Sequence, residues 1–251
     1  MELSRRQRTV EVWLVLGVSL GASAVYAVVQ LLQALTAKGG LSHATATLNA
    51  SQAPGRPWFD LTYQLLGILF TLVPVFLAVH LLGRQYPNVG GLLGIDTTRP
   101  GRDGLTGIGL AALIGIPGLG LYWAGRELGF SVTVVAEALP KIWWGIPVLI
   151  LAAIQNAISE EVIVVGYLTT RLTEFGWQRW RVIGTSALLR GSYHLYQGFG
   201  AFVGNAVMGV IFAYAYRRWG RVLPLIVAHS ILDIVSFIGY DLLAKHIAFL
   251  R

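Results

Sequence analysis

The amino-acid sequence predicts an all-α fold, a polytopic transmembrane helical bundle with about seven spans. Hydrophobic residues make up 55% of the chain and charged residues only 12%, whereas about a quarter of the residues in a soluble domain are charged. Apolar stretches close to the length of about 20 residues that crosses a bilayer also recur along the whole sequence. We therefore expect the 251 residues to form a single integral membrane domain.

The expected spans follow one another with mostly short connections. They lie at residues 10–35, 58–82, 105–124, 142–168, 182–196, 200–216 and 222–243. The first span follows three arginines and resembles a secretory signal peptide, but its apolar run continues past the signal-like stretch, which favours an uncleaved first helix. Only residues 197–199 join the fifth and sixth spans, which indicates a tight helical hairpin. The segment 37–56 is rich in Thr, Ala, Ser and Gly and is expected to be a flexible loop.

The positions of lysine and arginine predict the orientation and exclude some functions. With the N-terminus inside, 12 of the 19 basic residues fall in cytoplasmic segments and 6 in segments on the other side. This bias predicts that the N-terminus lies inside and the C-terminus outside. The basic residues form short clusters between apolar runs, so the net charge of +7 does not indicate nucleic-acid binding. The absence of cysteine excludes disulfides, thiol catalysis and thiolate metal sites.

Three short polar stretches interrupt the apolar runs of the C-terminal half, at residues 159–161, 190–194 and 229–233. An ionisable side chain in hydrocarbon costs several kcal/mol, so such residues usually face the interior of a bundle and serve function. At a rise of about 1.5 Å per residue, Glu160, His194 and His229 lie roughly 16, 20 and 12 Å below the cytoplasmic boundary. These depths overlap, which predicts one shared polar site in the cytoplasmic half of the bundle.

Within the stretches, residues one helical turn apart are expected to act together. Arg190 lies four residues before His194 on the same helix face, and it needs a carboxylate partner, for which Glu160 and Glu161 are the nearest candidates. His229 and Asp233 have the same spacing. An aspartate one turn along can accept a ring N–H and so fix the tautomer of the imidazole.

The predicted site can activate a water in two ways. In one, Glu160, His194 and His229 bind a zinc ion, which lowers the pKa of a coordinated water. In the other no metal is needed, and Glu160 and His194 act as general base on the water. His229 and Asp233 then stabilise the tetrahedral oxyanion. An ionised Asp233 cannot donate to an oxyanion, so it would have to be protonated or act by positioning His229. The sequence leaves both mechanisms open.

The same stretches resemble the motifs of the CPBP family of intramembrane proteases, which includes the CAAX prenyl endopeptidases and the bacteriocin-processing (Abi) group. Residues 160–168, EEVIVVGYL, resemble the family's EExxxRGYL motif. Residues 186–194, SALLRGSYH, resemble the second motif, which ends in the catalytic histidine, and residues 229–233, HSILD, resemble HxxxN/D. The resemblance implies a protease whose catalytic residues are Glu160, His194, His229 and Asp233, with Glu161 as a supporting acid.

One residue departs from the family pattern, because Val165 stands where the first motif has an arginine. We hypothesise that Arg190 supplies the missing cation to Glu161. The best-known activity of the family is cleavage after a prenylated cysteine, but no feature of this sequence indicates prenyl recognition. The expected partners are a membrane-associated peptide or protein substrate and the lipid bilayer, in the plasma membrane of a bacterium. Residues 142–243 are expected to form the catalytic core, and 10–124 the accessory N-terminal helices.

Two other function classes use the same residue types. An ion- or proton-coupled transporter also needs buried Glu, His and Asp, but the sequence has no internal repeat and no paired broken helices. A catalytically inactive scaffold or immunity protein of the same family would retain the polar cluster for packing. We favour the intramembrane endopeptidase.

Overall fold

The computed structural model describes residues 4–135, 139 and 142–239, which are mostly helical. Its elements are α1 (Arg5–Gly17), α2 (Leu20–Thr36), η1 (Leu41–His43), β1 (Thr45–Thr47), α3 (Pro57–Thr71), α4 (Val73–Gly83), α5 (Val89–Leu93), α6 (Pro100–Glu127), β2 (Thr133–Val135), α7 (Gly145–Glu160), η2 (Glu161–Tyr167), α8 (Leu168–Glu174), α9 (Arg179–Tyr193), η3 (Leu195–Gln197), α10 (Phe199–Trp219), α11 (Leu223–Ile234) and η4 (Val235–Gly239). Of these, η1 and η3 are 3₁₀ turns, whereas η2 and η4 are π-helices.

Four helical segments within the described residues are long and apolar enough to cross a membrane. They are Pro57–Gly83, Pro100–Glu127, Gly145–Glu174 and Phe199–Trp219. The pair α1 and α2 would add a fifth if it forms one broken span, whereas α11 with η4 is apolar but shorter. The helical, membrane-type fold is therefore confirmed. The count of about seven spans and the orientation stay predictions.

The first two expected spans are each broken into two helices. The axes of α1 and α2 differ by 51°, and at the break the Ser19 hydroxyl donates to the Val15 carbonyl at 2.5 Å. A side chain at Gly21 would lie 2.7 Å from the Leu16 carbonyl oxygen, so the sharp bend depends on this glycine. Between α3 and α4, Pro74 lies in the first turn of α4, where it has no N–H to donate to the preceding turn.

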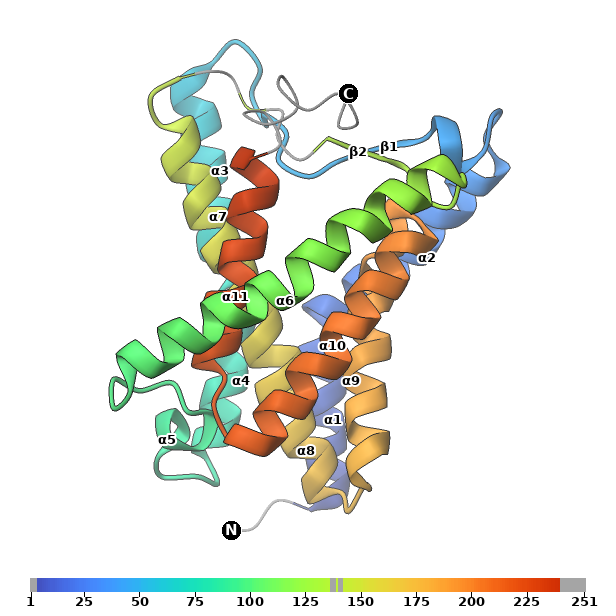
Figure 1. Ribbon diagram of the computed structural model, residues 1–251. Helices are drawn as coiled ribbons and strands as arrows, with labels where there is room; N and C mark the ends of the chain where they lie inside the picture. The colour runs from blue at the N-terminus through green and yellow to red at the C-terminus, as the bar shows by residue number, and fades with distance from the viewer. Residues whose placement is uncertain (1–3, 136–138, 140–141, 240–251) are drawn as a thin grey trace.

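The predicted hairpin of the fifth and sixth spans is present as α9, η3 and α10, which lie side by side (Figure 1). Glycines allow the two helices to approach closely. A Cβ atom on Gly191 would lie 2.9 Å from the Phe202 carbonyl oxygen, and one on Gly209 would lie 2.7 Å from the Cα atom of Ala187. This close packing holds the end of α9, with the second motif, against α10.

The segment 37–56 contains more order than the flexible loop that its composition predicts. It forms η1 and β1, and β1 pairs in parallel with β2, with Thr45 opposite Thr133 and Thr47 opposite Val135. The small sheet lies at the end of the molecule opposite the N-terminus (Figure 1). Strand β2 is itself tied to the hairpin, because the Val132 N–H donates to the Gln197 carbonyl at 3.3 Å. The sheet therefore packs over the end of α9.

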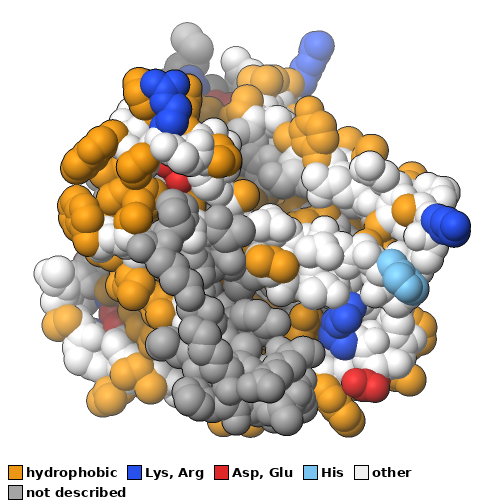
Figure 2. Space-filling view, turned by 90° about the horizontal axis from the view of Figure 1, so that it is seen from above, with side chains coloured by type: hydrophobic (Ala, Val, Ile, Leu, Met, Phe, Trp, Pro, Cys, Tyr) orange, Lys and Arg blue, Asp and Glu red, His pale blue; other side chains and the backbone are white. Residues whose placement is uncertain are grey.

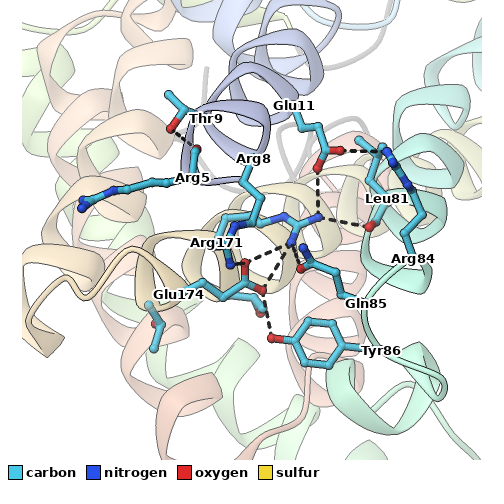
Figure 3. A network of polar contacts seen from close by, with 12 residues as sticks. Arg5, Arg8, Thr9, Glu11, Leu81, Arg84, Gln85, Tyr86, Arg171 and Glu174 are labelled. Atoms are coloured by element: carbon cyan, nitrogen blue, oxygen red, sulfur yellow. Dashed lines mark hydrogen bonds and ion pairs between the residues drawn. The ribbon is translucent and has the colours of Figure 1, made fainter. Parts of the chain in front are cut away.

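A buried ion network lies at the other end of the bundle and joins three helical segments (Figure 3). Arg171 of α8 is fully buried, and its guanidinium donates to Glu11 of α1 at 3.2 Å and to Glu174 at 3.0 Å. It also donates to the Leu81 carbonyl of α4 at 3.1 Å, and Glu174 accepts from the Tyr86 hydroxyl at 2.9 Å. This network fixes the N-terminal helix against the segment that carries the first motif.

Hydrophobic side chains cover much of the outer surface. Seen from above, they gather on the side where α3 and α7 lie, and charged side chains are few there (Figure 2). Helix α3 alone exposes Trp58, Phe59, Tyr63, Leu65, Leu66, Leu69 and Phe70. Most residues of the π-helix η2, by contrast, belong to the hydrophobic core. An apolar exterior around a core with buried charges is what a bilayer-embedded bundle requires.

Candidate active site

The two adjacent glutamates of the first motif lie at the junction of α7 and the π-helix η2. Glu160 ends α7 and is 8% exposed, and Glu161 begins η2 and is fully buried. A π-helical turn is wider than an α-helical turn and is often found at functional sites. Here the change of helix type occurs between the two carboxylates, and each contacts a different set of partners.

Glu161 lies between a guanidinium and an imidazole. Its Oε1 atom accepts from Nη2 of Arg190 at 2.5 Å and lies 2.7 Å from Nδ1 of His229. Arg190 is fully buried, and its guanidinium also lies 5.4 Å from the centre of the Phe212 ring. The ion pair that the sequence suggested between Arg190 and Glu161 is therefore present, and Glu161 links the second motif to the third.

Glu160 is held through one of its two oxygens. Its Oε2 atom accepts from the Tyr193 hydroxyl at 2.6 Å and from Nη1 of Arg190 at 3.3 Å. Within the described part of the chain, no hydrogen bond reaches Oε1. The carboxylate is thus fixed in orientation while one oxygen stays available. Tyr193 was not predicted from the sequence, because a tyrosine within a membrane segment is not unusual enough to mark a site.

His194 lies beside Glu160 but does not bond to it directly. The distance from Nε2 to Oε2 of Glu160 is 3.8 Å, which is longer than a hydrogen bond. Both ring nitrogens of His194 are buried, and neither has a hydrogen-bond partner among the described residues. The ring packs against that of Tyr193, with the centres 4.9 Å apart. A water lying to one side could contact both the imidazole and the carboxylate.

His229 is oriented by Glu161, and this corrects one expectation from the sequence. Its Nε2 atom lies 3.6 Å from Oδ1 of Asp233, too far for a hydrogen bond, whereas Nδ1 lies within 2.7 Å of Glu161. The partner that fixes the tautomer is therefore Glu161 rather than Asp233. The physical reason is that residues at i and i+4 share a helix face, but Glu161 approaches the ring from a neighbouring helix. Nε2 then faces the side of Asp233.

The three motifs, which are separate in the sequence, thus converge on one buried cluster. Residues 142–235, which include all three, match the family of Rce1-like type II CAAX prenyl endopeptidases. This match supports the assignment of residues 142–235 to the CPBP/CAAX protease family. The predicted family resemblance is confirmed, and because the family is one of proteases, the match supports a hydrolase at the level of the family only. Comparison with the curated proteins and with the solved structures gave no match.

The CAAX-family region of this chain begins at residue 142, where the predicted catalytic core also begins, and helices α1 to α6 lie outside it. Its departure from the family motif, Val165, is fully buried and belongs to the hydrophobic core. Apolar packing therefore occupies the position of the family arginine. The buried cation of the cluster comes from Arg190, on the second motif.

The residues proposed as zinc ligands do not fit a metal ion in this arrangement. Among the described residues, no group of three His, Asp or Glu side chains is placed to hold one. His229 directs Nδ1 at Glu161 and Nε2 toward Asp233, and one oxygen of Glu160 is held by Tyr193. The ligand atoms of Glu160, His194 and His229 therefore do not converge on a point.

Proposed function

We propose that this protein is an intramembrane endopeptidase that hydrolyses a peptide bond of a membrane-associated substrate with an activated water. The observation that carries the proposal is the pairing of a fixed carboxylate with a free imidazole. Glu160 offers Oε1, and His194 offers ring nitrogens that have no other partner in the described structure, with 3.8 Å between the two side chains. A water between them can give up a proton as its oxygen attacks the substrate carbonyl.

The tetrahedral intermediate needs donors for its oxyanion, and His229 is suited to this role. A ring whose Nδ1 lies against a carboxylate donates from that atom, so a protonated His229 carries a second N–H on Nε2. The Nε2 atom lies 3.6 Å from Oδ1 of Asp233. At this distance the carboxylate can stabilise a positive charge on the ring, but the N–H does not form a hydrogen bond to it. An oxyanion that enters this space can accept it.

The water oxygen forms a bond to the carbonyl carbon, and its proton moves to the Glu160–His194 pair. When the C–N bond breaks, the same pair returns a proton to the leaving amine, which departs as the new N-terminus. Arg190 stays bound to both glutamates and keeps the net charge of the buried cluster low. Arg190 is a positioning residue, because among the described residues its guanidinium donates hydrogen bonds to Glu160 and Glu161 and so acts through them.

The proposal is tested by hydrolysis of a mixture of short synthetic peptides in water enriched in ¹⁸O, by the purified protein in proteoliposomes. Mass spectrometry should detect one heavy oxygen in each new carboxylate, because water is the nucleophile. Glu160→Gln and His194→Ala should each lower the rate by about 10²-fold or more, the usual contribution of a general base. Glu127→Gln and His80→Ala, at exposed positions outside the cluster, are matched controls and should keep the rate.

The alternatives give different results in the same proteoliposomes. Electrogenic flux without peptide cleavage would identify a transporter. A folded protein that shows neither electrogenic flux nor peptide cleavage would be an inactive scaffold or immunity protein, provided that Glu160→Gln and His194→Ala keep its biological activity.

A further inference from the structure

A cavity of about 630 Å³ lies between α2, strand β1 and the end of the α9–α10 hairpin. Its walls include Gln30 and Gln33 of α2, Thr45 and Thr47 of β1, and Tyr193 and Tyr196. Among the described residues that line it, none is charged. The walls instead offer amides, hydroxyls and apolar surface, which can accept uncharged peptide groups but would leave a charged side chain without a partner.

The cavity reaches the candidate active site through Tyr193. The same side chain lines the cavity and donates its hydroxyl hydrogen to Glu160 at 2.6 Å. Its neighbour His194 packs against the Tyr193 ring, and Tyr196 follows two residues later on the cavity wall. A molecule bound in the cavity therefore lies next to the proposed catalytic pair.

Strand β1 lies beside this cavity, and one of its two edges is unpaired among the residues that the structure describes. Its inner edge faces β2, because the Thr133 N–H donates to the Ala44 carbonyl at 3.0 Å and the Leu48 N–H donates to the Val135 carbonyl at 3.0 Å. In a parallel ladder alternate residues of a strand bond to the same neighbour. The N–H and C=O groups of Thr45 and Thr47 consequently point to the outer edge. No hydrogen bond from the described part of the chain reaches them.

We propose that the substrate enters this cavity as an extended segment with uncharged side chains and adds a third strand to the outer edge of β1. This inference rests on the proposed peptidase function and specifies how its substrate is held. Backbone hydrogen bonds to an exposed strand edge give affinity without demanding a sequence, and pockets for alternate side chains give selectivity. An extended peptide also exposes its carbonyl groups to attack, which a helical membrane segment does not.

A proline substitution tests the backbone edge. Thr47→Pro removes the outward N–H and leaves the bonds to β2, since proline is tolerated on the free edge of a strand. Thr47→Ala is the matched control because it keeps that N–H. We expect Thr47→Pro to raise the KM for the peptide mixture roughly three- to tenfold, the effect of one lost hydrogen bond, with Thr47→Ala close to the wild type. Equal kinetics of both variants and the wild type would overturn the proposal.

A crosslinking experiment decides the docking site independently of catalysis. Because the chain has no cysteine, a single Thr47→Cys substitution can carry a benzophenone maleimide without other labelling. It is placed in the Glu160→Gln background, so that bound peptides stay intact. Thr36→Cys is the control, since Thr36 is an exposed threonine of α2 that does not line the cavity.

The probe is a mixture of short synthetic peptides whose randomised positions are uncharged, compared with a mixture that carries Asp and Lys at those positions. Several-fold more crosslinking at position 47 than at 36, with preference for the uncharged mixture, would support the proposal. Equal crosslinking at both positions would reject it even if the wild type hydrolyses peptides. Preferential crosslinking without hydrolysis would reject the peptidase function and keep the binding site.

Discussion

Arg190 is expected to stabilise the protein strongly, because it is the buried cation next to two buried carboxylates. It contacts Glu161 at 2.5 Å and Glu160 at 3.3 Å, and its side chain is not exposed at all. Removing one partner of a buried ion pair leaves an uncompensated charge and costs about 3–5 kcal/mol. We therefore expect Arg190→Met to lower the free energy of unfolding by about that amount and to abolish peptide hydrolysis.

A double-mutant cycle separates charge from packing. Arg190→Met and Glu161→Gln are measured singly and together by reversible unfolding in mixed micelles. In the double variant one of the two stranded carboxylates is gone, so its destabilisation should be at least about 1 kcal/mol smaller than the sum of the single effects. Arg190→Lys should be intermediate, because an ammonium cannot bond to both carboxylates as a guanidinium does. Strictly additive effects would refute the idea that Arg190 acts by compensating Glu161.

Three further predictions concern other parts of the molecule. Arg171→Met should lower the free energy of unfolding by about 3–5 kcal/mol and increase hydrogen exchange in α1, because the Arg171 side chain is fully buried. Arg84→Ala should lower it by less than about 1 kcal/mol, because the Arg84 side chain is 48% exposed. Similar losses of stability in the two variants would contradict the role given to burial. The Arg221 guanidinium, which donates to Asp96, holds the pKa of that carboxyl well below its usual range. This pair therefore stabilises the fold at neutral pH and loses its effect as the pH falls below about 4 and Asp96 becomes protonated. The difference in Tm between the wild type and Asp96→Asn should narrow in that pH range. A difference in Tm that stays constant with pH would refute the contribution of ionised Asp96 to stability. Finally, the metal-free mechanism predicts that a zinc chelator leaves the rate of peptide hydrolysis unchanged, and inhibition reversed by added zinc would contradict it.

The meeting of the three polar motifs could be predicted because burial makes their residues exceptional. A glutamate pair, an arginine and two histidines inside apolar runs need polar partners, and the other residues of this set are the nearest ones within the bundle. The contact of Arg190 with the glutamates is the plainest case, since a buried guanidinium requires a carboxylate. Their roles within the site were harder to predict. Which carboxylate reaches His229 depends on helix packing, and spacing on one helix pointed to Asp233 instead of Glu161.

Other features had no comparable signal in the sequence. Tyr193 bonds to Glu160, but a tyrosine near a membrane interface is common and does not mark a buried contact. Strands β1 and β2 have only three residues each, too few to show an alternating pattern, and the composition of 37–56 indicated a flexible loop. The breaks within the first two expected spans depend on close contacts around Gly21 and on Pro74, which hydropathy does not weigh.

The two adjacent glutamates illustrate how one buried cation can serve two purposes. Glu161 accepts from Arg190 and lies against His229 through the same oxygen, so it is held by two partners and orients the third motif. Glu160 accepts from Arg190 and Tyr193 through one oxygen and keeps the other available. The two carboxylates lie on either side of the junction between α7 and the π-helix η2, and they divide these tasks while a single guanidinium still reaches both. A cation on the facing helix can therefore satisfy the pair, and the hydrophobic core can occupy position 165.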